Sequence, residues 1–347
     1  MLTKLRTGPA AWWALLCVLI FGVVVALSVG RFMLSPWTVV QQLGALLSHQ
    51  SGLTNPDIAV EMAEKLVLHV RLPRVLTALL IGASLAMCGA ALQGAFRNPL
   101  VGPQILGISS GAALGGCLAI VFFSSMLSIL GMAFAGGLLA IALVYGISRV
   151  GGRNHILVLV LAGVVTGAFF SSLLSLLTYF ADPNDTLPAI VFWLMGSFAT
   201  ASYLKLGWVL VPMLAGMTVL CLMRFRINVL SMGDEHAASL GVRVERIRWL
   251  MLGCVALIVS SGVAVAGAIG WVGLIVPHFA RMLVGPDHRV LLPASALMGA
   301  IFMLCVDTVA RSLTVAEIPL DVITSLIGAP VFATVLRSAH GKGGAHA

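Results

Sequence analysis

Long apolar segments alternate with short polar breaks along almost the whole chain. A helix of about 20 apolar residues crosses a hydrocarbon layer of roughly 30 Å. Segments of about this length lie at residues 11–30, 75–95, 104–124, 128–148, 156–180, 203–223, 249–268, 270–285, 291–311 and 320–336. The pattern therefore predicts an all-α integral membrane protein with about ten transmembrane helices.

Two stretches leave the number of helices open. Residues 249–285 are divided only by the glycine-rich run AGAIGWVG, so one or two helices fit there. The stretch ADPNDTLPAIVFWLMGS can carry an additional short helix between two spans. The first apolar segment follows Lys4 and Arg6 and lacks a clear small-residue cleavage site, so we expect a retained helix and not a signal peptide.

The composition agrees with a membrane protein. Hydrophobic residues make up 60% of the 347 residues and charged residues only 9%, against roughly 25% charged residues in a soluble domain. The polar breaks are too short to form an independent soluble core. We therefore expect residues 1–347 to form one membrane domain.

The formal net charge of +8 could indicate a nucleic-acid partner. However, the basic residues stand at the ends of apolar segments and do not form a stripe, so we expect contact with membrane lipid and no nucleic acid. With the N-terminus inside, ten spans place 14 of the 20 Lys and Arg residues on the inner side. This asymmetry predicts that both termini are cytoplasmic.

The longest polar interruption, residues 224–249, reads RFRINVLSMGDEHAASLGVRVERIRW and falls on the cytoplasmic side. Acidic residues after Gly233 favour the start of a short helix, and Gly241 can end it in a left-handed conformation. We therefore predict a short helix outside the bilayer that can pack on a partner. The residues assigned to it are Gly233, Asp234, Glu235, Ala237, Ala238, Leu240 and Gly241.

Three arginines, Arg71, Arg74 and Arg311, fall on the outer side, where the positive-inside rule disfavours them. They need compensating partners, or they snorkel to lipid phosphate. Asp307 lies in an apolar segment, where an acid is a candidate proton relay. Its spacing of four residues from Arg311 favours mutual neutralisation on one helix face instead.

The sequence offers few residues for chemistry. It has no phosphate-binding loop of the form G-x-x-x-x-G-K-[ST], so ATP would have to be hydrolysed by another subunit. The six cysteines lack paired metal-ligand spacing, and the histidines are dispersed. We find no persuasive nucleophile and base pair. We expect a chain that is not an enzyme and has no metal or cofactor of its own.

Several ordered motifs resemble one transporter family. The run GDEHAASLGV resembles the coupling-helix loop of ABC-importer permeases. The runs RLPR, RNPL, GAIGWVGLIVPHFAR, DHRVLLP and EIPLDVITSLIGAPVF are similar, in wording and order, to permeases that import ferric siderophores, haem and vitamin B12. The resemblance covers nearly the whole chain and implies a type II ABC importer permease in a bacterial cytoplasmic (inner) membrane.

The resemblance also implies partners. Two cytoplasmic ABC ATPase subunits would bind ATP and Mg²⁺ and dock on residues 224–249, the coupling segment. A second permease subunit, identical or related, would complete the membrane domain. A periplasmic or lipoprotein substrate-binding protein would pair its glutamates with Arg71, Arg74 and Arg311, the outer arginine cluster.

In the family, the translocation path is lined mainly by the fifth helix, here residues 156–180. The polar and small residues on it are Gly163, Thr166, Gly167, Ser171 and Ser172. The inner gate would lie at His155, Ile156 and Leu157, where relatives can carry small hydroxyl residues, so this chain favours a hydrophobic closure.

The resemblance favours a ferric siderophore as substrate, with haem and cobalamin as alternatives. An ion-coupled secondary transporter that works alone is an alternative of another class. It would need an ion-binding acid at mid-membrane depth and would not need the coupling segment.

Overall fold

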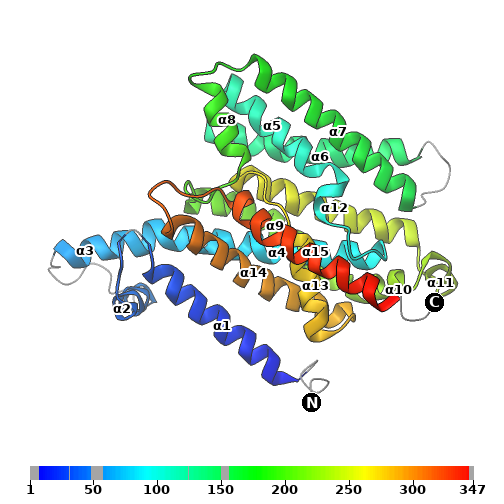
Figure 1. The fold of residues 1–347 in the computed structure, drawn as a ribbon, viewed down its shortest axis with the longest axis horizontal. Helices are drawn as coiled ribbons and strands as arrows, with labels where there is room; N and C mark the ends of the chain where they lie inside the picture. The colour runs from blue at the N-terminus through cyan, green and yellow to red at the C-terminus, as the bar shows by residue number, and fades with distance from the viewer. Residues whose placement is uncertain (1–7, 31, 48–57, 124, 150–155, 344–347) are drawn as a thin grey trace.

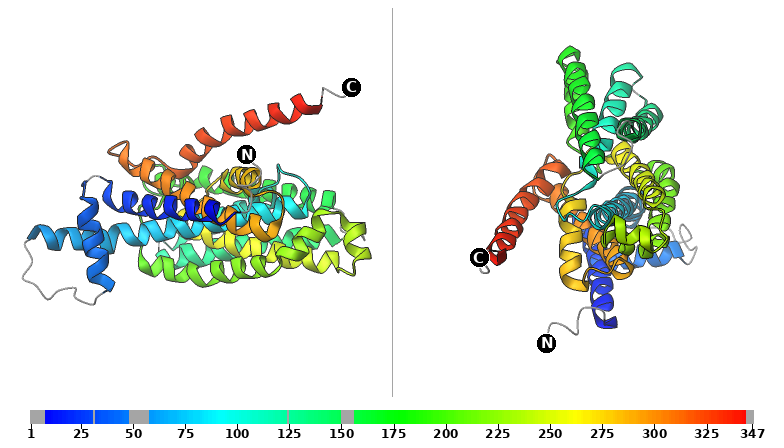
Figure 2. Two further views of the ribbon diagram at one scale, coloured as in Figure 1. Left: turned by 90° about the horizontal axis from the view of Figure 1, so that it is seen from below. Right: turned by 90° about the vertical axis from the view of Figure 1, so that its right-hand side faces the viewer.

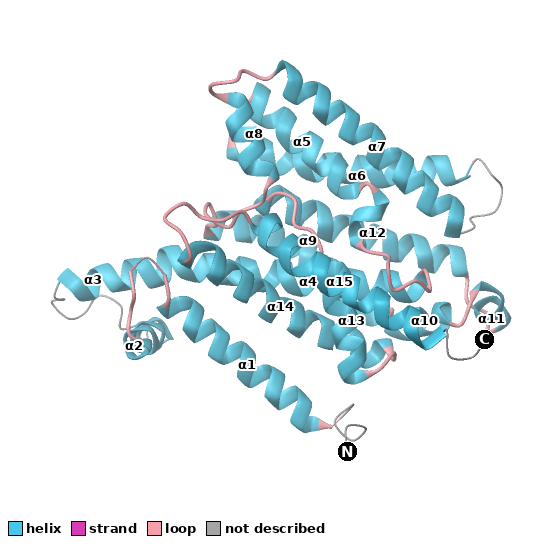
Figure 3. Cartoon of the chain, viewed as in Figure 1, coloured by secondary structure: helices cyan, strands magenta, loops and turns pink. Residues whose placement is uncertain are grey.

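The computed structural model describes residues 8–30, 32–47, 58–123, 125–149 and 156–343. Helices connected by short loops account for this part of the chain, and the described residues contain no strand (Figure 3). The predicted all-α class is confirmed.

The helices follow the apolar pattern of the sequence. The N-terminal half contains α1 (Pro9–Ser28), α2 (Pro36–Leu47), α3 (Ile58–Lys65), the π-helical turn η2 (Leu66–Arg71), α4 (Leu72–Ala95), the 3₁₀ turn η3 (Pro103–Leu106), α5 (Ile108–Phe122), α6 (Met126–Arg149) and α7 (Ile156–Phe180). The C-terminal half contains α8 (Thr186–Leu194), α9 (Tyr203–Leu222), α10 (Arg224–Ser231), α11 (Asp234–Ser239), α12 (Val244–Ala266), α13 (Val272–Val284), α14 (His288–Ser312) and α15 (Leu320–Gly343).

All ten predicted spans coincide with apolar helices. Among the described residues, seven helices are long and apolar enough to cross a membrane, and three shorter apolar helices occupy residues 108–122, 272–284 and 320–334. The glycine-rich run does separate α12 from α13, and the suggested additional short helix exists as α8. The two points that the sequence left open are thereby decided.

The predicted start of the second span at residue 75 is wrong. A continuous helix runs from α3 through η2 into α4, and its apolar part covers Met62–Ala95. Pro73 has no N–H to donate to the carbonyl four residues earlier, and the wider π-helical turn that precedes it accommodates this missing bond. The RLPR motif therefore lies inside a helix and not in a loop before one.

Two helix breaks occur inside the bundle. The expected span at 104–124 begins with η3, and Gly107 in the left-handed region (φ 71°) separates η3 from α5. Gly267 (φ 72°) and Trp271 (φ 67°) bound the second break, between α12 and α13. Trp271 is unusual, since large residues rarely adopt positive φ.

Helices α4 and α12 form the centre of the molecule, and both are largely buried. Helices α5, α6, α7 and α8 form a group on one side, whereas α15 leaves the bundle at an angle on another (Figures 1 and 2). Helices α10 and α11 lie at one end of the bundle, and α2 and α3 lie at the opposite end (Figure 1). The polar segments expected on the inner and outer sides thus lie at opposite ends of the molecule.

Candidate functional site

The coupling segment folds into three helical pieces at one end of the bundle. Helix α10 was not predicted, whereas α11 occupies the predicted place after Gly233. Gly233 (φ 115°) and Gly241 (φ 77°) adopt positive φ at the two ends of α11, as the sequence indicated for Gly241. The N–H of Val242 donates to the carbonyl of Ala237 over 3.0 Å and closes the C-terminal turn.

The start of α11 is fixed by an ion pair that sequence reasoning missed. Nη2 of Arg248, on α12, lies 2.7 and 2.9 Å from the two carboxylate oxygens of Asp234. The Arg248 side chain is 2% exposed, while that of Asp234 is 39% exposed. The sequence pattern at the start of α11 does not indicate that Asp234 pairs with a residue 14 positions later. This contact is visible only in the folded structure.

The side chains of α11 divide between an inner and an outer face. Ala237 is wholly buried in the core, so it supports the helix and does not offer the partner surface expected for it. Glu235 and Ala238 are exposed, and Leu240 is 63% exposed. The available partner surface is therefore made by this exposed set.

Other motifs converge on the same end of the bundle. A Cβ atom on Gly233 would lie 3.2 Å from Nη1 of Arg97, which belongs to the RNPL motif. Asn228 of α10 donates from Nδ2 to Oδ1 of Asp287 over 2.6 Å, and its Oδ1 accepts from the N–H of His288 over 2.8 Å. Hydrogen bonding to Arg289 lowers the pKa of Asp287 below its usual range. Helix α10 is thereby tied to the start of α14.

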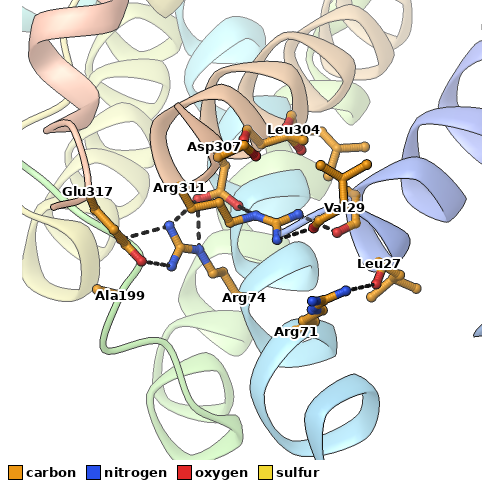
Figure 4. A network of polar contacts seen from close by, with 12 residues as sticks. Leu27, Val29, Arg71, Arg74, Ala199, Leu304, Asp307, Arg311 and Glu317 are labelled. Carbon is orange, nitrogen blue, oxygen red and sulfur yellow. Dashed lines mark hydrogen bonds and ion pairs between the residues drawn. The ribbon is translucent and has the colours of Figure 1, made fainter. Parts of the chain in front are cut away.

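The outer arginine cluster lies at the opposite end, near the start of α4 and the end of α14 (Figure 4). Arg74 donates from Nε to Asp307 over 2.9 Å and from Nη1 and Nη2 to Glu317 over 2.8 and 3.0 Å. Asp307 is fully buried, and the Arg74 side chain is 11% exposed. The expected pair between Asp307 and Arg311 exists at 3.5 Å, longer than the contacts of Arg74.

Arg71 and Arg311 hold the C-terminal end of α1. Arg71 donates from Nη1 to the carbonyls of Leu27 and Ser28, and Arg311 donates to those of Val29 and Ala26 (Figure 4). These carbonyls have no partner inside the helix, and cations are favoured at this end of its dipole. The sequence did not indicate this use of the arginines. All three arginines are at least partly engaged within the chain.

Helix α7 carries most of the residues assigned to the translocation path. Gly163 packs against η3, since a Cβ there would lie 2.5 Å from the carbonyl oxygen of Ile105, and Thr166 is buried. Gly167 is half-buried against Gly107, whereas Ser171 and Ser172 are exposed. Ile156 is half-buried and Leu157 is exposed at the helix start; His155 lies outside the described residues.

The two helix breaks supply surface that the sequence did not indicate. A cavity of about 150 Å³ lies between α4, α12 and the two breaks, and Ser109, Gln104, Ile269 and Trp271 are among its lining residues. Beside it, the N–H of Gly270 donates to Oδ1 of Asp321 over 3.1 Å. The unusual φ of Trp271 has no signature in the sequence beyond the neighbouring glycines.

Among the described residues, no group of three or more His, Cys, Asp or Glu side chains is arranged to hold a metal ion. The polar contacts described above tie helices to one another. Such contacts between helices hold the helices in place relative to one another.

Comparison with known proteins gives consistent matches. The model of the FecCD transport family matches residues 18–338. The molybdate import system permease protein MolB of Haemophilus influenzae is 43% identical over 328 residues, which cover 94% of this chain and 95% of MolB. A Helicobacter pylori protein named "Probable iron chelatin transport system permease protein" is 44% identical over 276 residues, 80% of this chain and 83% of its own. Further relatives are named as hemin and vitamin B12 permeases.

A solved structure gives the same result for the fold. It shows an inward-facing conformation of a metal-chelate type ABC transporter, superposes with a TM-score of 0.84 at 42% identity, and covers 95% of this chain and 100% of its own. The resemblance inferred from the motifs is confirmed, and molybdate joins the substrates named for its members. This chain belongs to the FecCD transport family and is a multi-pass membrane permease of the ABC importer type.

Proposed function

We propose that this chain is the transmembrane subunit of an ATP-driven importer that moves a ferric chelate from the outer side into the cytoplasm of a bacterium. The observation that carries the proposal is α11, a short helix at one end of the bundle that is fixed to α12 by the Asp234–Arg248 pair and is followed directly by the exposed Leu240. A solvated connector would need neither a buried anchor nor an exposed apolar tip.

In this proposal, two ATPase subunits bind ATP and Mg²⁺ and dock on α11 of two permease subunits. Family membership favours ATP hydrolysis over ion coupling as the energy source. ATP-driven closure of the ATPases then moves α11 and switches the translocation path between outward and inward exposure. The orientation follows from the charge asymmetry, with α11 and both termini in the cytoplasm.

The path lies between this chain and a second permease subunit, either identical or related. Helix α7 supports this placement because it exposes large apolar side chains and carries no charged residue between Ile156 and Phe180. Ser171 and Ser172 add hydroxyls to the exposed surface, while Gly163 and Thr166 contribute by packing α7 on η3. Ile156 and Leu157, with His155 beside them, form a hydrophobic closure at the inner end.

A substrate-binding protein docks at the end that carries the outer arginine cluster. Arginines bind carboxylates through two parallel hydrogen bonds, and Arg74 already uses this geometry with Glu317. Glutamates of the binding protein would therefore share or replace contacts that this chain makes internally. Electrostatic pairs of this kind set the orientation and rate of docking more than its affinity.

Two substrate classes remain in competition. The apolar surface of α7 favours a bulky chelate that shields its metal, such as a ferric siderophore, with haem and cobalamin as members of the same size class. The extensive similarity to a permease named for molybdate favours a small oxyanion as the second candidate. An apolar path would have to carry that charge without fixed partners, at an energetic cost.

Uptake by proteoliposomes distinguishes these possibilities. The vesicles would hold this chain and its ATPase, with ATP inside and the binding protein outside, and would be offered ferric siderophores, haem, cobalamin and molybdate in turn. Uptake of a ferric siderophore that requires both ATP and the binding protein supports the proposal. If molybdate is the only compound imported, the proposed substrate is wrong and molybdate takes its place. Uptake driven by an ion gradient without the ATPase would overturn the proposed ATP-driven mechanism.

A further inference from the structure

Polar contacts join the short helices α10 and α11 of the coupling segment to long helices of the bundle. The Asp234–Arg248 pair joins α11 to α12, and Asn228 joins α10 to the start of α14 through Asp287 and His288. The first contact involves α11, the helix that Leu240 directly follows. The Asp234–Arg248 pair therefore gives α11 a direct side-chain connection to α12.

The contact joins a buried guanidinium to a carboxylate that is 39% exposed, so it differs from a fully exposed surface ion pair. The guanidinium lies in the second turn of α12 and is 2% exposed, among the largest fully buried side chains of the chain. Breaking such a pair removes the carboxylate that faces a buried guanidinium, whereas an exposed pair contributes little. The side chain can therefore act as a stiff link between the two helices.

Helix α12 leads from this link to the central cavity. It is largely buried along its length, and it ends at Ala266, directly before the break that contributes Ile269 and Trp271 to the cavity wall. Because a packed helix moves as a rigid element, a displacement at Arg248 moves the break at the other end. One end of α12 thus contacts the coupling helix, and the other lines a cavity whose wall includes Ile105, against which Gly163 of α7 packs.

We propose that Arg248 is a positioning residue for coupling: it holds α11 against α12, so that movement of α11 displaces the α12–α13 break at the cavity. This inference rests on the proposed function. Arg248 acts through Asp234, since its own side chain is buried within this chain. Replacement of Arg248 therefore uncouples ATP hydrolysis from substrate transport, while the ATPase stays bound to the permease.

The test compares Arg248→Met, Arg248→Lys and Asp234→Asn in proteoliposomes that hold the ATPase, with a panel of ferric siderophores, haem, cobalamin and molybdate as probes. The measured quantity is the amount of substrate imported per ATP hydrolysed. Arg149→Met is the control, because Arg149 is an exposed arginine at the end of α6, outside the coupling segment.

We expect Arg248→Met and Asp234→Asn each to lower import per ATP by about fivefold or more, the usual range of a coupling between sites. Retention of the ATPase during purification should stay unchanged. Arg248→Lys should import more substrate per ATP than Arg248→Met. The double variant Asp234→Asn/Arg248→Met should import no less per ATP than Arg248→Met. A merely structural role would lower thermal stability and ATPase retention and leave import per ATP intact in the complexes that remain.

The outcomes separate the two proposals. No ATP-dependent import of any probe by the unaltered chain overturns the proposed function and this inference with it. Normal import per ATP in both Arg248→Met and Asp234→Asn overturns the inference alone. If Arg248→Met does not fold, Asp234→Asn decides the matter, since it changes only the partly exposed partner and leaves the interior of α12 intact.

Discussion

Arg74, Arg311 and Asp307 show what a single sequence reveals about a residue and what it leaves out. The spacing of four between Asp307 and Arg311 predicts a pair on one helix face, and the pair exists. The shorter contacts, however, come from Arg74, which is more than 200 residues away in the chain. Spacing along a helix can be read from sequence, whereas partners on other helices depend on how the helices pack.

Arg74→Gln should destabilise the protein strongly. The change leaves the fully buried Asp307 carboxylate with only its longer contact to Arg311, and breaking a buried pair costs about 3–5 kcal/mol. Thermal unfolding in detergent measures the effect. Arg289→Gln is the control, because the Arg289–Asp287 pair is exposed and should contribute little to stability. Equal loss in both variants would contradict this account of the outer arginine cluster.

At the scale of the elements, the apolar pattern predicts most of the helices because each one must satisfy its backbone internally in lipid. Helices α2, α3 and α10 and the turn η2 escaped prediction. The three helices are short and partly polar, and η2 arises from the position of Pro73 within a longer helix. The coupling helix was predictable because glycines and acids mark its ends. Its anchor on Arg248 was not, because the anchor comes from a different helix.

Close contact between α4 and α14 depends on glycine. A Cβ atom on Gly82 would lie 2.2 Å from the carbonyl oxygen of Gly299, so the two backbones touch. Gly82→Ala must separate the helices and should cost about 1–3 kcal/mol, measured by thermal unfolding. Gly131→Ala on α6 meets no atom within 4 Å and should be neutral or slightly stabilising, since alanine favours helix. Similar unfolding temperatures for the two variants would contradict tight packing at Gly82.

The exposed tip of the coupling helix yields a third prediction. Leu240→Asp places a charge where an apolar contact with the ATPase is proposed, and the amount of ATPase that co-purifies should fall at least about tenfold, as expected for a central apolar contact. Leu313→Asp is the control, because Leu313 is similarly exposed (67% against 63% for Leu240) at the other end of the bundle. Undiminished co-purification with Leu240→Asp would remove α11 from the interface.

For the whole molecule, the charge asymmetry predicts an orientation that labelling can check. In a chain whose six cysteines are replaced by alanine, Leu240→Cys and Leu313→Cys place single thiols at opposite ends of the bundle. A membrane-impermeant maleimide added to intact spheroplasts should label Leu313→Cys only, and permeabilisation should add Leu240→Cys. The reverse pattern would invert the topology and place the outer arginine cluster in the cytoplasm.

The contacts at the end of α1 have a consequence for how the protein is made. Only a small share of α1 is buried against the rest of the bundle, and its last carbonyls are held by Arg71 and Arg311. A ribosome that synthesises the chain releases α1 into the membrane early, but one of the two guanidinium groups that bind it emerges only near the end of translation. The first helix to enter the bilayer is therefore among the last to be secured, and a chain truncated before α14 keeps it in the membrane without its final attachment.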